Sequence, residues 1–354
     1  GIPLEDMEFF QFHPTGIKGL GILISEAVRG EGGILRNRDG KRFMEHYSPT
    51  LLDLAPRDIV ARSILTEIRA GQGIRGDRKI DDYVHLDATH LGKDILGAKL
   101  PDITSFCQTY LGLDPADSAI PVLPTAHYAM GGIPTDIDGR VIRDGKGTIV
   151  EGLYAAGECA CVSVHGANRL GTNSLLDLVV FGRRAGRHIG EYVKEVEVPA
   201  VSEDVTDTAA GWIKQLTDGQ SGPHGGHIME EMQTTMMANV GIYRNEKDMQ
   251  AAVGQIQNLL DRYQQVRVQD SGSAFNTDLL ELIELRNLLD LSLLTAAAAL
   301  NRQESRGAHS REDFPDRDDD NWLKHSLAYL NGDTVRIEYK KVDTSIWEPK
   351  PRTY

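Results

Sequence analysis

The fold is decided by Gly152-Leu-Tyr-Ala-Ala-Gly-Glu158, an apolar strand pattern that ends in Gly-Glu. After a loop through Asn168-Arg-Leu-Gly171, residues 174–191 carry a strongly helical pattern. Asn173 or Ser174 stands in the position of its N-cap. A helix rich in Gly and Ala that faces strands is typical of nucleotide-binding α/β folds. We therefore expect part of such a fold at the centre of the chain.

The regions on either side have different patterns. Residues 1–126 mix short apolar strand patterns, such as residues 7–12, with Gly-rich turns and a helical pattern over residues 57–69, which predicts an α+β domain. Beyond about residue 205 apolar residues step by three and four, and residues 278–300 are apolar nearly all round, so we expect a buried helix in a bundle. The expected regions are 1–126, 127–200, 201–310 and 311–354.

The composition excludes several classes of protein. The 354 residues carry 38 Lys and Arg against 52 Asp and Glu, and this net charge of −14 would repel nucleic acid. No apolar run reaches the roughly 18 residues of a membrane span, so we expect membrane contact to go through partners. Three cysteines are too few for a disulfide framework and lack metal-site spacing. Because Gly1-Ile2-Pro3 leads directly into apolar sequence, we expect the chain to begin within a longer protein.

Side chains that could bind an anion recur beside glycines, where a ligand can approach the backbone closely. They are His13, Ser25, Glu26, Arg29, Arg57, His127 and Arg169. Taken singly, each is more simply explained as a hydrogen-bonded histidine, an ion pair or a helix end. Together they suit a small dianion, because Arg binds carboxylate through two bonds and His or Ser adds a directed one. The predicted ligand carries two carboxylates.

Eight motifs, in one order along the chain, closely resemble the flavoprotein subunits of the succinate dehydrogenase family. They are Gln11-Phe-His-Pro-Thr-Gly16, Arg29-Gly-Glu-Gly-Gly33, Arg57-Asp58 with Ala61-Arg62, His127-Tyr-Ala-Met-Gly-Gly132, Gly157-Glu158, His165-Gly-Ala-Asn-Arg-Leu-Gly171, Asn173-Ser-Leu-Leu176 and Glu304-Ser-Arg-Gly-Ala-His309. The resemblance covers essentially the whole chain. Fumarate reductase and L-aspartate oxidase share many of these motifs, while residues 175–182, the acidic run from Asp313 and the ending Arg352-Thr-Tyr354 are most like the dehydrogenase.

The resemblance implies a mixed α+β/α fold: an α+β capping domain, a partial Rossmann-type flavin domain that binds FAD, and a C-terminal helical bundle. It implies that succinate is oxidised to fumarate, with proton removal by one residue and hydride transfer to the flavin. The implied catalytic residues are Arg57 for the proton, with Glu26 and Arg29 as a relay to solvent. The implied substrate ligands are His13, Ser25, His127 and Arg169. The implied flavin contacts are Glu158, Asn173, Ser174 and Leu175.

The resemblance also implies partners. An iron–sulfur subunit would take electrons from the flavin toward quinone. Membrane-anchor subunits would hold the complex on the cytoplasmic face of a bacterial inner membrane or the matrix face of a mitochondrial one.

Two departures from the family pattern stand out. Ser25 replaces the threonine of many relatives but keeps the hydroxyl. The glycine-rich turn for the FAD pyrophosphate is absent, since Gly16-x-x-Gly-x-Gly21 has the wrong spacing, and none of the 11 histidines lies in a segment like the one that the family links to flavin. We expect both features to lie outside this chain. The non-enzymatic alternative is therefore a fragment that keeps only packing and partner-docking surfaces.

Overall fold

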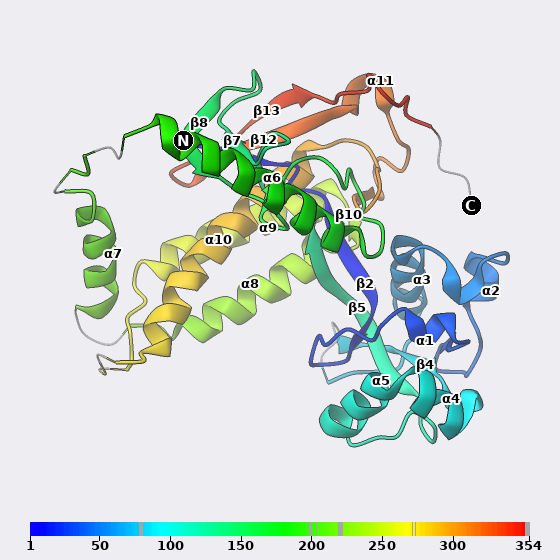
Figure 1. Cartoon of the computed structure of the whole chain (residues 1–354). Coiled ribbons are helices and arrows are strands. Elements are labelled where there is room, and N and C mark those ends of the chain that lie inside the picture. Colours follow the sequence, from blue (N-terminus) through cyan, green and yellow to red (C-terminus); the bar gives the residue numbers. More distant parts are fainter. Residues whose placement is uncertain are drawn as a thin grey trace. The chain divides into compact units, whose positions relative to one another are not determined.

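The computed structural model describes residues 1–77, 81–197, 200–202, 204–218, 222–270, 272 and 274–350 (Figure 1). The chain divides into two compact units. One unit is Phe10–Tyr128, and the other combines Gly1–Phe9 with Ala129–Tyr354. The boundaries expected at residues 126, 200 and 310 stay predictions.

The Phe10–Tyr128 unit is built on a four-stranded sheet in the order β2-β5-β4-β3. Its strands are β2 (Phe10–Ile17), β3 (Ile34–Arg36), β4 (Val84–Asp87) and β5 (Ile120–Ala129, whose last residue belongs to the other unit). Its helices are α1 (Ala27–Gly30), α2 (Met44–Tyr47), α3 (Arg57–Arg69), α4 (Gly92–Lys99) and α5 (Pro101–Phe106), with single turns at Leu52–Leu54, Thr89–Leu91 and Cys107–Leu111. Helix α3 packs on β2, and its residues Val60 and Ile64 enter a core with Ile17 and Leu86.

The helix predicted from the sequence periodicity over residues 57–69 is confirmed, because α3 spans these residues. Pro56 precedes its first residue, where a missing N–H costs nothing. The strand expected over residues 7–12 is displaced and becomes β2 over residues 10–17. Asp6 takes a left-handed φ of 56°, and the Phe9 N–H donates to the Asp6 carbonyl at 3.1 Å, so the chain turns before the strand begins.

The other unit combines small sheets with a helical bundle. The chain ends meet in the sheet β1-β12-β13, formed by Leu4–Glu5, Lys324–Asn331 and Thr334–Lys341, in which both strand pairs are antiparallel. The hairpin of β7 (Arg140–Ile142) and β8 (Ile149–Tyr154) is antiparallel. Two short parallel pairs complete the strands: β6 (Ile133–Pro134) with β9 (Ala160–Cys161), and β10 (Tyr243–Arg244) with β11 (Ser310–Arg311).

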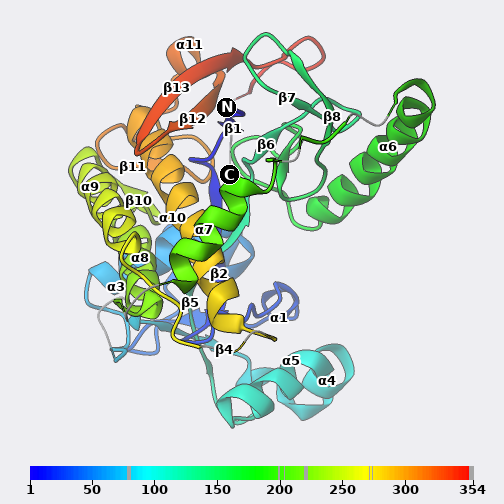
Figure 2. The same ribbon diagram turned by 90° about the vertical axis from the view of Figure 1, so that its left-hand side faces the viewer.

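Helices α8 (Gly225–Asn239), α9 (Glu246–Tyr263) and α10 (Thr277–Asn301) lie side by side around an apolar core (Figures 1 and 2). Two further helices, α7 (Asp207–Thr217) and α11 (Asp319–Trp322), belong to the same unit. The bundle expected beyond residue 205 is therefore present. However, α10 is not buried all round, because Leu280, Leu288 and Leu291 are exposed. No helix among the described residues has the length and apolar character needed to cross a membrane.

The predicted helix after the central strand is α6, which spans Asn173–Glu195. Its N-cap is Thr172, not Asn173 or Ser174, because Thr172 takes a left-handed φ of 63° just before the first helical residue. The strand expected over residues 152–158 is also displaced, since β8 ends at Tyr154. Helix α6 lies against the end of β8, where the Tyr154 hydroxyl is 2.8 Å from His188 Nδ1. Arg184 Nε also donates to the Ile137 carbonyl at 2.6 Å, in the turn before β7.

Candidate active site

An ion cluster lies where α3 begins. Arg57 is the first residue of α3, and its Nε donates to Glu26 Oε2 at 3.1 Å. The same oxygen lies 3.9 Å from Nη2 of Arg29 on α1. One carboxylate is therefore shared by two guanidinium groups. The side chain of Glu26 is 46% exposed, that of Arg57 18% and that of Arg29 0%.

The buried end of this cluster is held by Asp53. Nη1 of Arg29 donates to the Asp53 backbone carbonyl at 2.5 Å, while the Asp53 carboxylate accepts from Arg42 and from the Leu35 N–H. Burial lowers the pKa of Arg29, and the charge of Arg57 lowers it further, against the opposing charges of Glu26 and Asp53. The structure thus brings together Arg57 and its two predicted relay residues, Glu26 and Arg29. Glu26 has the most exposed side chain of the three, whereas that of Arg29 is fully buried.

Two predicted substrate ligands come from neighbouring strands of one sheet. His13 on β2 and His127 on β5 face each other edge to face, with ring centroids 5.4 Å apart. His13 is buried, and its Nδ1 accepts from the Thr15 N–H at 3.3 Å. Ser25 is exposed, and its Oγ accepts from the Ala27 N–H at 3.2 Å. That hydroxyl uses its oxygen in the turn before α1, which leaves its proton for donation.

The remaining predicted residues gather around the start of α6 in the other unit. Arg169 is buried, and its Nη1 donates to Ser174 Oγ at 3.2 Å. Glu158 Oε1 accepts from the Ala129 N–H at 3.2 Å. The N-cap side chain of Thr172 makes no capping bond to the first turn of α6. The Asn173 and Leu175 N–H groups donate to the Leu170 and Thr172 carbonyls, so the first turn offers its remaining N–H groups and the partial positive charge of a helix N-terminus. This suits an electron-rich carbonyl edge of a flavin.

A buried pair that the sequence reasoning missed holds this loop. His165 Nε2 lies 3.0 Å from Asp177 Oδ2, and both side chains are buried. The amide of Asn173 lies 3.5 Å from His165 Nδ1. The available signal was a single acid, Asp177, within the apolar run 175–180. Asp53 was also missed, because nothing in its sequence surroundings indicates Arg29 as a partner.

The predicted site residues thus form two groups, each defined within its own unit. The Phe10–Tyr128 unit holds His13, Ser25, Glu26, Arg29, Arg57 and His127, and the other unit holds Glu158, Arg169, Asn173, Ser174 and Leu175. Contacts within the groups join Arg57, Glu26 and Arg29, His13 and His127, and Arg169 and Ser174. Their roles toward substrate and flavin stay predictions.

Comparison with known proteins defines the class. Residues 1–175 match the family described as FAD binding domain, and residues 229–354 match the family described as fumarate reductase flavoprotein C-term. The chain is therefore of the FAD-binding flavoprotein type, and the expectation of FAD is confirmed at the level of the domain. More narrowly, it belongs to the family of succinate dehydrogenase and fumarate reductase flavoprotein subunits, which confirms the resemblance found in the sequence.

Three relatives illustrate the match. The succinate dehydrogenase flavoprotein subunit of Coxiella burnetii is 48% identical over 97% of this chain and 58% of that protein. The mitochondrial subunit of Oryza sativa is 43% identical over 100% of this chain and 58% of that protein. The structure of the E. coli quinol fumarate reductase superposes with a TM-score of 0.91 at 42% identity, over 100% of this chain and 62% of that one. The chain thus spans about three fifths of its relatives' length, and its mixed α/β fold is theirs.

Proposed function

We propose that this chain is the larger part of a succinate dehydrogenase flavoprotein subunit, which oxidises succinate to fumarate. The observation that carries the proposal is the ion cluster at the start of α3, where Glu26 is shared between Arg57 and Arg29. The dehydrogenase direction is supported by the names of relatives at 43–48% identity. Fumarate reductases at 41–42% identity support the same chemistry in the opposite direction.

The mechanism has two parts: side chains that bind the substrate carboxylates, called the clamp, and side chains that carry the proton to water, called the proton path. His13, His127, Ser25 and Arg169 bind the two carboxylates, with Arg169 supplying a buried charge. FAD would be held by Glu158 and the start of α6, and when bound it would supply the hydride acceptor. Arg57 first gives one guanidinium proton to the Glu26 carboxylate, to which it is bonded, and as a neutral guanidine it then takes the proton from the neighbouring carbon. Glu26, whose side chain is exposed, releases its proton to water.

The partner in this proposal is an iron–sulfur subunit that receives electrons from the flavin toward quinone, in a complex held at the membrane by anchor subunits. Solved relatives include a quinol-fumarate reductase with menaquinol molecules, which supports such an electron path. We expect the iron–sulfur subunit to dock on surfaces of the unit that contains α6 and the C-terminal region. Cross-links from that subunit exclusively to residues 1–126 would contradict this.

The clamp and the proton path are separable by mutation in the full-length subunit loaded with flavin, called the flavin-loaded protein below. We expect Arg57→Gln to abolish most turnover while leaving flavin content and malonate binding largely intact, because its role is proton transfer. Arg169→Ala should weaken malonate binding by about 2–5 kcal/mol, the cost of removing one partner of a buried charge pair. Arg38→Gln, at an exposed arginine of the same unit as Arg57, is the control and should change neither.

The measurements are steady-state kinetics and malonate titration by calorimetry. A defect of Arg57→Gln confined to the Michaelis constant would make Arg57 a binding residue. Unchanged malonate affinity in Arg169→Ala would remove Arg169 from the clamp. Failure of the flavin-loaded full-length subunit without substitutions to bind malonate or oxidise succinate would overturn the proposed function as a whole.

A further inference from the structure

The loop that carries Arg169 touches a segment far along the chain. The Ala308 N–H donates to the Ala167 carbonyl at 2.9 Å. The neighbouring residue, Gly307, has a left-handed φ of 58°, and a Cβ at that position would lie 2.4 Å from the same carbonyl oxygen. Two backbones therefore meet at a distance that only glycine permits. The proposed function gives this contact no role.

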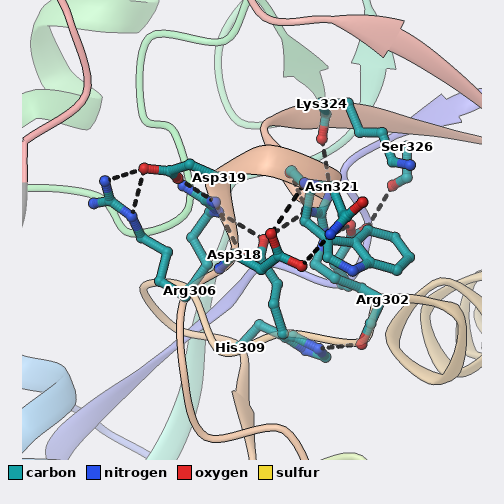
Figure 3. A network of polar contacts seen from close by, with 12 residues as sticks. Arg302, Arg306, His309, Asp318, Asp319, Asn321, Lys324 and Ser326 are labelled. Carbon is teal, nitrogen blue, oxygen red and sulfur yellow. Dashed lines mark hydrogen bonds and ion pairs between the residues drawn. The ribbon is translucent and has the colours of Figure 1, made fainter.

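The turn that makes this contact is itself fixed on both sides. Its ends are joined by paired backbone bonds, from the Arg306 N–H to the His309 carbonyl at 2.8 Å and in return at 3.0 Å. The Arg306 side chain bonds Glu304 at 2.7 and 2.9 Å and Asp319 at 2.7 Å. Figure 3 shows Arg306, His309 and Asp319 within this network of polar contacts. The turn is thus held by side chains on either side of it.

His309 anchors the other end of the turn in the protein interior. It is fully buried, its Nδ1 lies 2.6 Å from Arg244 Nη1, and its Nε2 lies 3.3 Å from the Arg302 carbonyl. Burial, and next to it the charge of Arg244, holds the pKa of His309 well below its ordinary value. The neutral ring can therefore accept from Arg244 at Nδ1 and donate to the carbonyl from Nε2. The turn is a rigid support.

The Arg169 loop, residues 165–171, is held at three places along its length. Its start is fixed by the pair of His165 and Asp177, and its end by the bond from Arg169 to Ser174. The contact of Ala167 with the turn supplies the middle support. Because Arg169 follows Ala167 by two residues, any displacement of that carbonyl moves the backbone that carries the guanidinium.

We propose that the turn Arg306–His309 is a positioning element for Arg169: its backbone, brought close by Gly307, sets the place of the Ala167 carbonyl and with it the guanidinium. The functional part of this inference rests on the proposed function, in which Arg169 binds a substrate carboxylate. A displacement of about 1 Å in such a contact can cost up to ~100-fold in rate. The Glu304–His309 motif is then a support for the substrate clamp rather than part of it.

The test compares two glycines of nearly equal backbone geometry. Gly307→Ala places a methyl group against the Ala167 carbonyl, whereas Gly332→Ala, at φ 60°, places one in open space. Both variants place a side chain at nearly the same left-handed φ, and Gly307→Ala alone adds a close contact with a carbonyl. In malonate titrations of the flavin-loaded protein, we expect Gly307→Ala to weaken affinity at least ~10-fold and Gly332→Ala to leave it within twofold of the control. In an Arg169→Ala background, Gly307→Ala should add nothing, whereas a merely structural defect would add its full effect.

A second readout needs no ligand. The Nε–Hε NMR signal of Arg169, assigned by its loss in Arg169→Ala, should shift or broaden in Gly307→Ala and stay in place in Gly332→Ala. Should Gly307→Ala fail to fold, Arg306→Lys loosens the turn without adding a methyl, since lysine cannot form the forked bonds to Glu304 and Asp319. An unchanged signal in the folded variant would overturn the inference. If the protein without substitutions does not bind malonate, the proposed function is overturned. The NMR signal still decides whether the turn positions Arg169.

Discussion

Arg302 should be among the residues whose loss most destabilises the chain. It is 1% exposed, and its guanidinium donates to Glu8 at 2.6 Å and to Glu304 at 2.9 Å, both carboxylates being fully buried. The same group donates to the carbonyls of Trp322 at 2.9 Å and Lys324 at 2.8 Å. Arg302→Met would keep much of the side-chain volume and remove all four bonds.

The expected loss of stability follows from the hydrogen bonds that each carboxylate keeps in Arg302→Met. Glu304 keeps two bonds from Arg306, whereas Glu8 keeps one bond, from the uncharged hydroxyl of Ser326. Breaking a buried ion pair from one side costs about 3–5 kcal/mol because it leaves a charge uncompensated. That is a large fraction of the roughly 5–15 kcal/mol by which a domain is stable. With a urea m-value of up to about 3 kcal/mol/M, the unfolding midpoint should fall by about 1 M or more.

The assay is urea unfolding of the flavin-loaded protein, followed by circular dichroism and tryptophan fluorescence. Adding Glu8→Gln to Arg302→Met should recover at least half of the loss, because the uncompensated charge is then gone. Arg38→Met, at an exposed arginine, is the control and should stay within about 0.5 kcal/mol. A loss below about 1 kcal/mol for Arg302→Met, or no recovery in the double variant, would refute the reasoning.

Two further predictions concern pH and the chain by itself. Although burial opposes it, the bond to Asp6 and the charge of Glu5 raise the pKa of His325, so its stabilisation is complete below the unfolded value of about 6.5 and is lost as pH rises through the folded value. The melting temperature should therefore fall between pH 6.5 and 9, and His325→Gln should flatten that slope; parallel curves would argue against it. Expressed alone, the chain should be colourless and aggregate, because α6 exposes Leu175 (62%), Leu176 (63%) and Val179 (62%) to water. A yellow preparation that oxidises succinate would contradict this.

Local signals were sufficient for helix α3 and insufficient for the start of α6. In α3 the apolar spacing, Pro56 before the first residue and a basic last turn agree, and the predicted range is the observed one. At α6 the standard capping residues Asn173 and Ser174 misled the prediction, because the chain turns at Thr172 through a left-handed conformation. A β-branched residue adopts φ above zero only where its surroundings enforce it. Nothing in the neighbouring sequence indicates that enforcement.

The types of residue in the site were predictable, but their partners were not. Arginines and histidines beside glycines indicated an anion, and family resemblance indicated which one. The contacts that hold these residues and their loops come from distant segments. Arg29 donates to the Asp53 carbonyl, and the Ala167 carbonyl accepts from the Ala308 N–H. Glu8 and Arg302 are 294 positions apart. Such pairs follow from tertiary packing, which spacing and propensity do not encode in a single sequence.

The start of α6 is held by polar contacts on one side of the helix, while its apolar side chains are left uncovered. Asp177 binds His165, and Ser174 accepts from Arg169, all within buried or half-buried surroundings. Leu175 and Leu176 lie between Ser174 and Asp177 in the sequence, Val179 follows two residues after Asp177, and all three are exposed. The order of the Arg169 loop therefore does not depend on burial of the apolar face. Covering that face would stabilise the fold by up to about 1.5–3 kcal/mol per side chain, whereas the geometry at the helix N-terminus is set by Asp177, Ser174 and the support at Ala167.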